Sequence, residues 1–146
     1  MQLSLEAALL NVSNLHMSVQ FYQDVFKLQV VAKDDLVAVL KIEARGREQV
    51  LVLREVGEDA FRPGRGNIGP RLLALQVDSR EDLAQIEERL SQRKALIGQR
   101  RNDTWEAIVG IDPDRIQITV SSSTTGAPIQ ASDWAGLDEI IYQIGQ

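Results

Sequence analysis

A chain of 146 residues, 44% hydrophobic and 25% charged, has the composition of an ordinary globular protein with one real core. The net charge of −5 argues against nucleic acid as a partner, because phosphate binding needs a concentrated positive surface. The sequence has no cysteine and one histidine, His16, which excludes disulfides, cysteine nucleophiles and metal centres built from several His and Cys ligands. No apolar run is long enough to span a bilayer and no signal peptide is recognisable, so we expect a cytoplasmic protein without membrane contact.

The first half of the chain is predicted to hold one helix and four strands. Alternating apolar residues and turn signals predict strands over 7–12, 28–32, 36–42 and 49–55. A helix over 15–27 is capped by Asn14 or Ser13, whose side chains accept hydrogen bonds from the first turn. The apolar stripe of this helix consists of Met17, Phe21, Tyr22, Val25 and Phe26.

The second half repeats this order. Ser79 is predicted to cap a helix that ends near 93–94, with Asp82 at the capping-box position. Strands are predicted over 71–77, 95–100, 105–111 and 115–121. A polar linker follows over 121–125, and then a short amphipathic helix over 133–144. Its stripe of Trp134, Leu137, Ile141 and Ile144 must be covered, either by its own domain or by a partner subunit.

The repeated order predicts an α+β fold, with helices on one face of largely antiparallel sheets. The other face of each sheet is left for a cleft. We expect one domain, with module one at about 5–57, a linker at 58–69, module two at about 70–121 and a C-terminal extension at 122–146.

Three motifs resemble the vicinal oxygen chelate superfamily of glyoxalases, extradiol dioxygenases, and fosfomycin- and bleomycin-resistance proteins. They are Val12-Ser13-Asn14-Leu15 through Ser18, Phe21-Tyr22 and Val25; Val77-Asp78-Ser79 with Glu81-Asp82-Leu83; and Asp112-Pro113-Asp114. The resemblance covers about residues 7–121. It implies two βαβββ modules that form a cup-shaped mixed sheet, often completed by a homodimer.

The family's enzymes hold a divalent metal in the cup, and the resemblance places the corresponding positions at Ala7, Leu72 and Thr119, with a fourth near Val52. None of these side chains is a usual ligand for such a metal. The family usually has glycine where this chain has Arg115. A one-residue shift there brings Ile118 or Val120 to the last position, and neither is a ligand. We therefore expect no metal and no other cofactor.

The cup lining follows from strand alternation. It consists of Ala7, Leu9, Asn11, Val50, Val52, Arg54, Leu72, Ala74, Gln76, Gln117 and Thr119, with Trp105 as a further candidate. This largely apolar set with a few polar groups suits an organic ligand and offers no acid–base pair or nucleophile, so no residue is assigned as catalytic. Trp105 either stacks on a flat ligand or packs at a strand edge.

Three functions compete. The first is a metal-independent protein that binds a small organic molecule and sequesters a drug or metabolite, as the bleomycin-resistance branch does. The second is a lyase, isomerase or dioxygenase-like enzyme with a non-standard site, for which Arg54, Glu106 and Asp112 are the available groups. The third is a non-catalytic interaction or regulatory domain, suggested by the amphipathic tail around Trp134.

Overall fold

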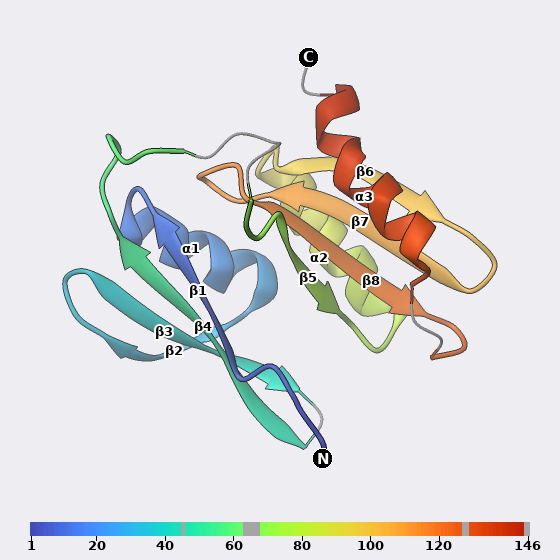
Figure 1. Cartoon of the computed structure of the whole chain (residues 1–146), viewed down its shortest axis with the longest axis horizontal. Helices are drawn as coiled ribbons and strands as arrows, with labels where there is room; N and C mark the ends of the chain where they lie inside the picture. The colour runs from blue at the N-terminus through green and yellow to red at the C-terminus, as the bar shows by residue number, and fades with distance from the viewer. Residues whose placement is uncertain (45, 63–67, 127–128, 145–146) are drawn as a thin grey trace. The chain divides into compact units, whose positions relative to one another are not determined.

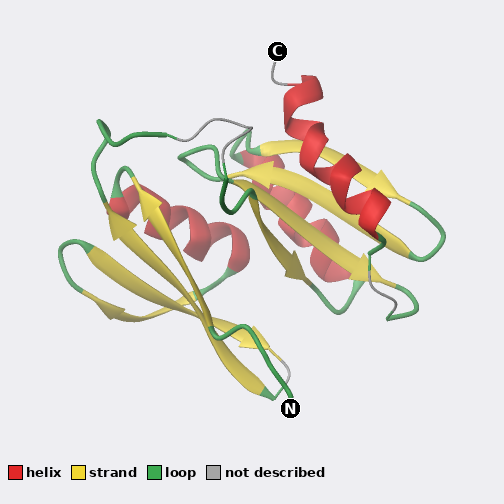
Figure 2. Ribbon diagram, viewed as in Figure 1, coloured by secondary structure: helices red, strands yellow, loops and turns green. Residues whose placement is uncertain are grey.

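The computed structural model describes residues 1–44, 46–62, 68–126 and 129–144 (Figures 1 and 2). The chain divides into two compact units, Met1–Pro63 and Gly64–Gln146. Within the described ranges, no helix is both long and apolar enough to cross a membrane. The predicted linker at 58–69 falls partly on residues 63–67, which lie outside the described ranges.

Unit 1 is a four-stranded sheet with one helix on it. Its elements are β1 (Ala7–Val12), α1 (Leu15–Phe26), β2 (Gln29–Lys33), β3 (Val37–Ala44) and β4 (Arg47–Glu55). The strand order is β1-β4-β3-β2. β1 runs parallel to β4, and the other neighbours are antiparallel.

Unit 2 repeats this topology and adds a helix. Its elements are β5 (Leu72–Gln76), α2 (Arg80–Gln92), β6 (Leu96–Arg101), β7 (Trp105–Ile111), β8 (Gln117–Ser123) and α3 (Ala131–Ile144). The strand order is β5-β8-β7-β6, again with one parallel pair, β5 with β8. The predicted α+β fold of two βαβββ modules with a C-terminal helix is therefore confirmed. The polar linker expected over 121–125 begins later, because β8 continues through Ser123.

The helix starts follow the predicted chemistry. Asn14 Oδ1 accepts a hydrogen bond from Met17 N at 3.1 Å, and Ser79 Oγ accepts one from Asp82 N at 3.1 Å. The prediction for Met17 itself is wrong, since its side chain is 52% exposed. The buried face of α1 is made by Leu15, Ser18, Val19, Phe21, Tyr22 and Val25.

Each unit has its core between its first helix and one face of its sheet. In unit 1, the fully buried Tyr22 stacks with Phe26 and lies edge-on to Phe21. In unit 2, α2 lies so close to β7 that a Cβ added to Gly110 would stand 3.0 Å from Leu90. A larger residue at this point of β7 would require Leu90 or the main chain at Ala95 to shift.

The turn between β7 and β8 is tied by one buried carboxylate. Asp112 Oδ1 accepts hydrogen bonds from Asp114 N at 2.8 Å and Ile116 N at 2.9 Å. Arg115 has a φ of 65°, the left-handed conformation that glycine adopts without steric cost. A residue other than glycine thus adopts the left-handed conformation in this turn.

Candidate functional site

The strands of unit 1 present two different faces. Val12, Leu51 and Leu53 point toward α1 and are buried. The neighbouring side chains point away from the helix, and the register places them in facing pairs across the parallel β1–β4 pair. These pairs are Ala7 with Val50, Leu9 with Val52, and Asn11 with Arg54. We call these six residues the open face of unit 1; they are the residues that alternation predicted for this half.

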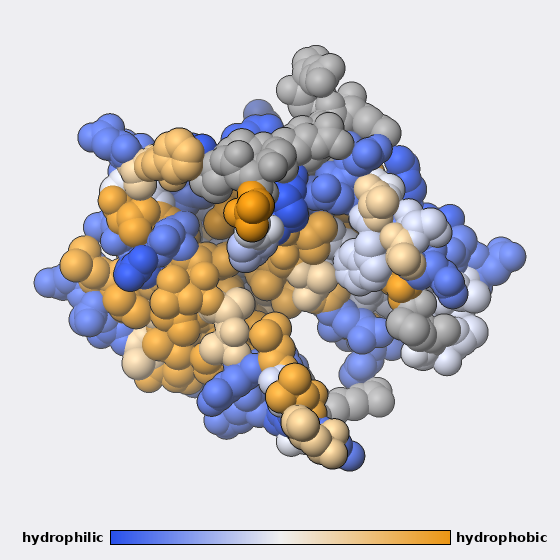
Figure 3. All heavy atoms as spheres, viewed as in Figure 1, coloured by the Kyte–Doolittle hydropathy of each residue, from blue (hydrophilic) through white to orange (hydrophobic). Residues whose placement is uncertain are grey.

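The open face of unit 1 is mainly apolar. Leu9 is 55% exposed, and Val39 of β3 continues the apolar surface beside Val52. Figure 3 shows apolar side chains gathered over β1, β3 and β4 on the side seen in Figure 1. At one end, Arg54 Nε donates a hydrogen bond to Asn11 Oδ1 at 2.9 Å. An apolar surface with one oriented guanidinium suits an organic molecule that carries a polar or anionic group.

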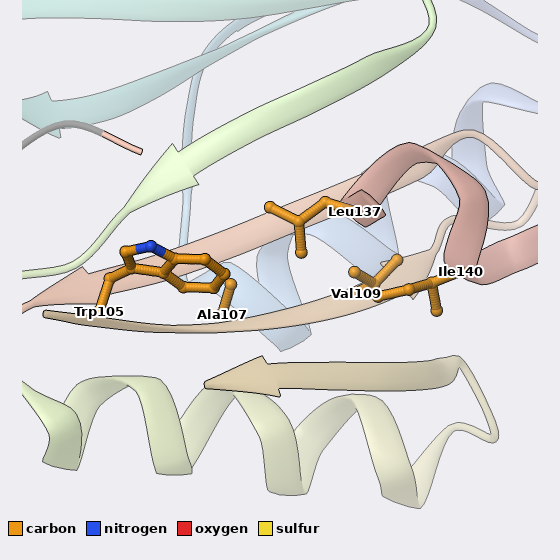
Figure 4. Packing of buried hydrophobic residues seen from close by; sticks show 5 residues of the cluster. All are labelled: Trp105, Ala107, Val109, Leu137 and Ile140. Carbon is orange, nitrogen blue, oxygen red and sulfur yellow. The ribbon is translucent and has the colours of Figure 1, made fainter. Parts of the chain in front are cut away.

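The corresponding face of unit 2 is covered by α3 (Figures 1 and 4). Here the register pairs Leu72 with Gln117 and Ala74 with Thr119, while Gln76 pairs with Ser121. Leu137 and Ile140 of α3 pack against a patch on β7 made of Trp105, Ala107 and Val109. We call the surface under α3 the covered face of unit 2; it comprises Trp105, Ala107, Val109, Gln117 and Thr119.

Two polar contacts add to this packing. Gln117 Nε2 donates a hydrogen bond to the main-chain oxygen of Leu137 at 3.0 Å. Arg71 forms an ion pair with Asp138 of α3 at 3.4 Å, with both side chains about one-third exposed. Such a partly exposed pair contributes no more than about 1 kcal/mol.

Three polar atoms of the covered face have no hydrogen-bond partner among the described residues. They are Trp105 Nε1, Gln117 Oε1 and Thr119 Oγ1, on side chains whose residues are only 6%, 3% and 1% exposed. Buried polar groups in proteins are nearly always paired. The covered face therefore carries more hydrogen-bonding capacity than α3 satisfies.

Apolar packing and unpaired polar atoms affect the stability of the α3 contact with opposite signs. Burial of Leu137 and Ile140 stabilises the contact by about 1.5–3 kcal/mol each. A buried polar atom without a partner costs about 1–3 kcal/mol, and α3 leaves three of them. The unpaired polar atoms therefore subtract from the stability that the packing of α3 supplies.

The structure answers the question that the amphipathic tail left open. α3 packs on the sheet of its own unit, through Leu137 and Ile140. Trp134, predicted to lie on the buried stripe, is 36% exposed, so the stripe is rotated from the predicted one. The side chains of Ile141 and Ile144 lie outside the described residues. Trp105 packs beneath α3 and is not at an open strand edge.

The remaining candidate groups have structural roles. Glu106 binds Arg101 at 2.7 Å and Arg80 at 3.4 Å, which ties β7 to β6 and to the start of α2. Asp112 holds the turn described above. His16 is exposed on the first turn of α1. A surface hollow of about 390 Å³ lies beside α2, and none of the predicted site residues lines it.

The four positions implied for a metal do not form a suitable donor set. Ala7 and Val52 lie on the open face of unit 1, and Leu72 pairs with the strand that carries Thr119 in unit 2. Three hydrocarbon side chains and one hydroxyl lack the imidazole and carboxylate groups that bind divalent metals. Across the part of the chain that the structure describes, no group of three or more His, Cys, Asp or Glu could hold a metal ion.

Comparison with protein families gives a match to the model of the glyoxalase/bleomycin resistance protein/dioxygenase superfamily over residues 4–120. No curated protein matches the chain.

Solved structures share the fold at low identity. A glyoxalase/bleomycin resistance protein/dioxygenase domain from Frankia sp. EAN1pec is 21% identical, with a TM-score of 0.65 over 87% of this chain and 96% of that one. Lactoylglutathione lyase from Agrobacterium tumefaciens is 17% identical, with a TM-score of 0.65 over 86% and 97%. A fosfomycin resistance protein from Listeria monocytogenes is 19% identical, with a TM-score of 0.66 over 85% and 96%.

Proposed function

Because this chain belongs to the glyoxalase/bleomycin resistance protein/dioxygenase superfamily, we propose that it binds a small organic molecule without a metal ion and sequesters it unchanged. The observation that carries the proposal concerns the four positions at which the family's enzymes would hold a metal. This chain has Ala7, Val52, Leu72 and Thr119 at these positions. The strands that carry them keep an uninterrupted register. The chain thus retains the family's scaffold with side chains that suit an organic ligand better than a cation.

The open face of unit 1 supplies a binding surface for such a molecule. Leu9, Val50 and Val52 offer apolar contact, and the Arg54 guanidinium offers charge-assisted hydrogen bonds to an oxygen. Substitution of Arg54 by alanine is expected to weaken binding of an anionic ligand more than that of a neutral one. Lys41→Ala, at the opposite end of the same face and paired with Glu48, serves as the charge-matched control.

Native mass spectrometry of the protein purified from its own host, without added metal, tests the proposal. The expected spectrum shows a metal-free chain that carries an organic adduct, and the adduct is recovered with unchanged mass after denaturation. One tightly held divalent metal per chain would overturn the proposal. Steady conversion of the recovered compound would do the same in favour of a lyase, isomerase or dioxygenase-like enzyme.

The same spectrum reports the oligomeric state. We propose a cytoplasmic homodimer, supported by the exposed apolar side chains of unit 1, among them Leu9 and Val31 at 55% and 52% exposure. A dimeric mass is expected, and a monomer over the whole concentration range would refute this part of the proposal.

A further inference from the structure

The two units differ at equivalent places. In unit 1, the residues on the sheet face opposite the helix are exposed or half-buried. In unit 2, the equivalent face is buried because α3 lies on it (Figure 4). One helix of the chain thus occupies a surface of the type that the proposed function assigns to a small molecule.

The fit of α3 to this surface is incomplete in chemistry. The helix supplies Leu137 and Ile140 to the apolar patch of Ala107 and Val109, and one main-chain oxygen to Gln117. The described part of the helix supplies no hydrogen bond to Trp105 Nε1, Gln117 Oε1 or Thr119 Oγ1. A helix whose main-chain groups bond to one another has few groups left to offer such atoms.

The unpaired atoms indicate which hydrogen-bonding groups a ligand of this face would need. Trp105 Nε1 can only donate a hydrogen bond, Gln117 Oε1 can only accept one, and the Thr119 hydroxyl can do both. Gln117 and Thr119 stand two residues apart on β8, so their side chains emerge about 7 Å apart on one face. Ala107 and Val109 form an apolar floor beside them. A flat, mostly apolar molecule with a carbonyl or carboxamide group matches this set.

We propose that α3 is a displaceable cover that competes with such a molecule for the covered face of unit 2. This inference rests on the proposed function. Binding of the ligand requires α3 to leave, and the apparent affinity is lowered by the fraction of molecules in which the helix is seated. Substitutions in α3 that weaken its packing on the sheet therefore strengthen ligand binding, although the substituted residues touch no ligand.

The absence of cysteine from the chain gives a direct measure of α3 opening. Ala107→Cys places one thiol beneath α3, and Ala38→Cys places one in the core of unit 1, where α1 covers the sheet; both alanines are fully buried. A maleimide reacts with a buried thiol only while the covering element is open. We expect Ala107→Cys to react at least about tenfold faster than Ala38→Cys under native conditions. Equal rates would mean that both thiols react only on global unfolding, and would refute the proposal that α3 is a displaceable cover.

The competition itself is tested with anilinonaphthalene sulfonate, an aromatic probe of apolar surfaces. Leu137→Ala with Ile140→Ala is expected to tighten probe binding about tenfold, and Asp138→Asn, which removes only the ion pair to Arg71, to tighten it about two- to threefold. Ser132→Ala, on an exposed position of α3, is the control and leaves the affinity unchanged. If the double variant loses its helical circular dichroism signal, Asp138→Asn decides the outcome. Unchanged probe affinity in Asp138→Asn would then refute the competition.

The two proposals fail in different ways. If an organic adduct is present in the native mass spectrum but Ala107→Cys reacts no faster than Ala38→Cys, the proposal that α3 is a displaceable cover is wrong and the proposed function stands. If Ala107→Cys reacts fast but neither an adduct nor probe binding is found in any variant, α3 opens and the proposed function is wrong.

Discussion

Thr119→Val is expected to stabilise the protein and to weaken its binding of a small molecule. The Thr119 hydroxyl is 1% exposed and has no hydrogen-bond partner among the described residues. Such a group costs about 1–3 kcal/mol, and valine replaces it by a methyl group of nearly the same size, with at least equal preference for a strand. We expect the free energy of unfolding to rise by about 1 kcal/mol and the melting temperature by about 3 °C.

Urea titration followed by tryptophan fluorescence measures this change, because Trp105 lies on the same face as Thr119. Thr104→Val is the matched control. The Thr104 hydroxyl donates to Asn102 Oδ1 at 3.0 Å, so the same substitution there should lower the free energy of unfolding by about 0.5–1.5 kcal/mol. A loss of stability in Thr119→Val would mean that the hydroxyl is satisfied, and the reasoning about the covered face would be refuted.

Three further predictions concern the scaffold. Leu53→Ala, at a fully buried position between β4 and α1, should cost about 2–5 kcal/mol in urea unfolding, and a cost below about 1 kcal/mol would contradict the packing of unit 1. Arg115→Gly should gain about 0.5–1 kcal/mol in the same measurement by relieving the positive φ, whereas Arg115→Ala should gain nothing. Hydrogen bonds from the main-chain N–H groups of Leu36 and Val37 lower the pKa of Asp34. The Asp34 carboxylate therefore contributes to stability above its unfolded pKa of about 3.9, and this contribution is lost as the pH falls through the lower folded pKa. NMR titration of the carboxyl group would show the lowered pKa. Asp34→Asn would abolish this part of the pH dependence of stability.

The sequence was a good guide to strand phase. In β1 the side chains alternate between apolar and mixed character, so Ala8, Leu10 and Val12 could be assigned to the helix side and the residues between them to the other. A period of two leaves only two choices, and a buried face decides between them. The structure places Ala7, Leu9 and Asn11 on the side away from α1, as expected.

The destination of α3 could not be predicted in the same way. An amphipathic stripe shows that a face must be covered, but does not identify the surface that covers it. One signal was available: Ala107 to Ile111 is an unbroken apolar run, which is typical of a strand covered on both faces. β4 carries a similar run at 50–53 although only one of its faces is buried, so an apolar run alone does not identify the surface that α3 covers. The roles of Arg71 and Asp138 had no signal in the sequence, since their contact joins residues 67 positions apart.

One outermost strand of each sheet carries an irregularity that bears on self-association. β2 and β6 each end the strand order of their sheet, and each carries a bulge, between Val30 and Ala32 in one and between Leu96 and Gly98 in the other. An extra residue bends an edge strand and interrupts its row of hydrogen-bonding groups, so that strands of other molecules do not add to it. Deletion of Val31 would straighten one such edge next to an exposed apolar surface. We therefore expect the bulges of β2 and β6 to oppose fibril formation at these two edges.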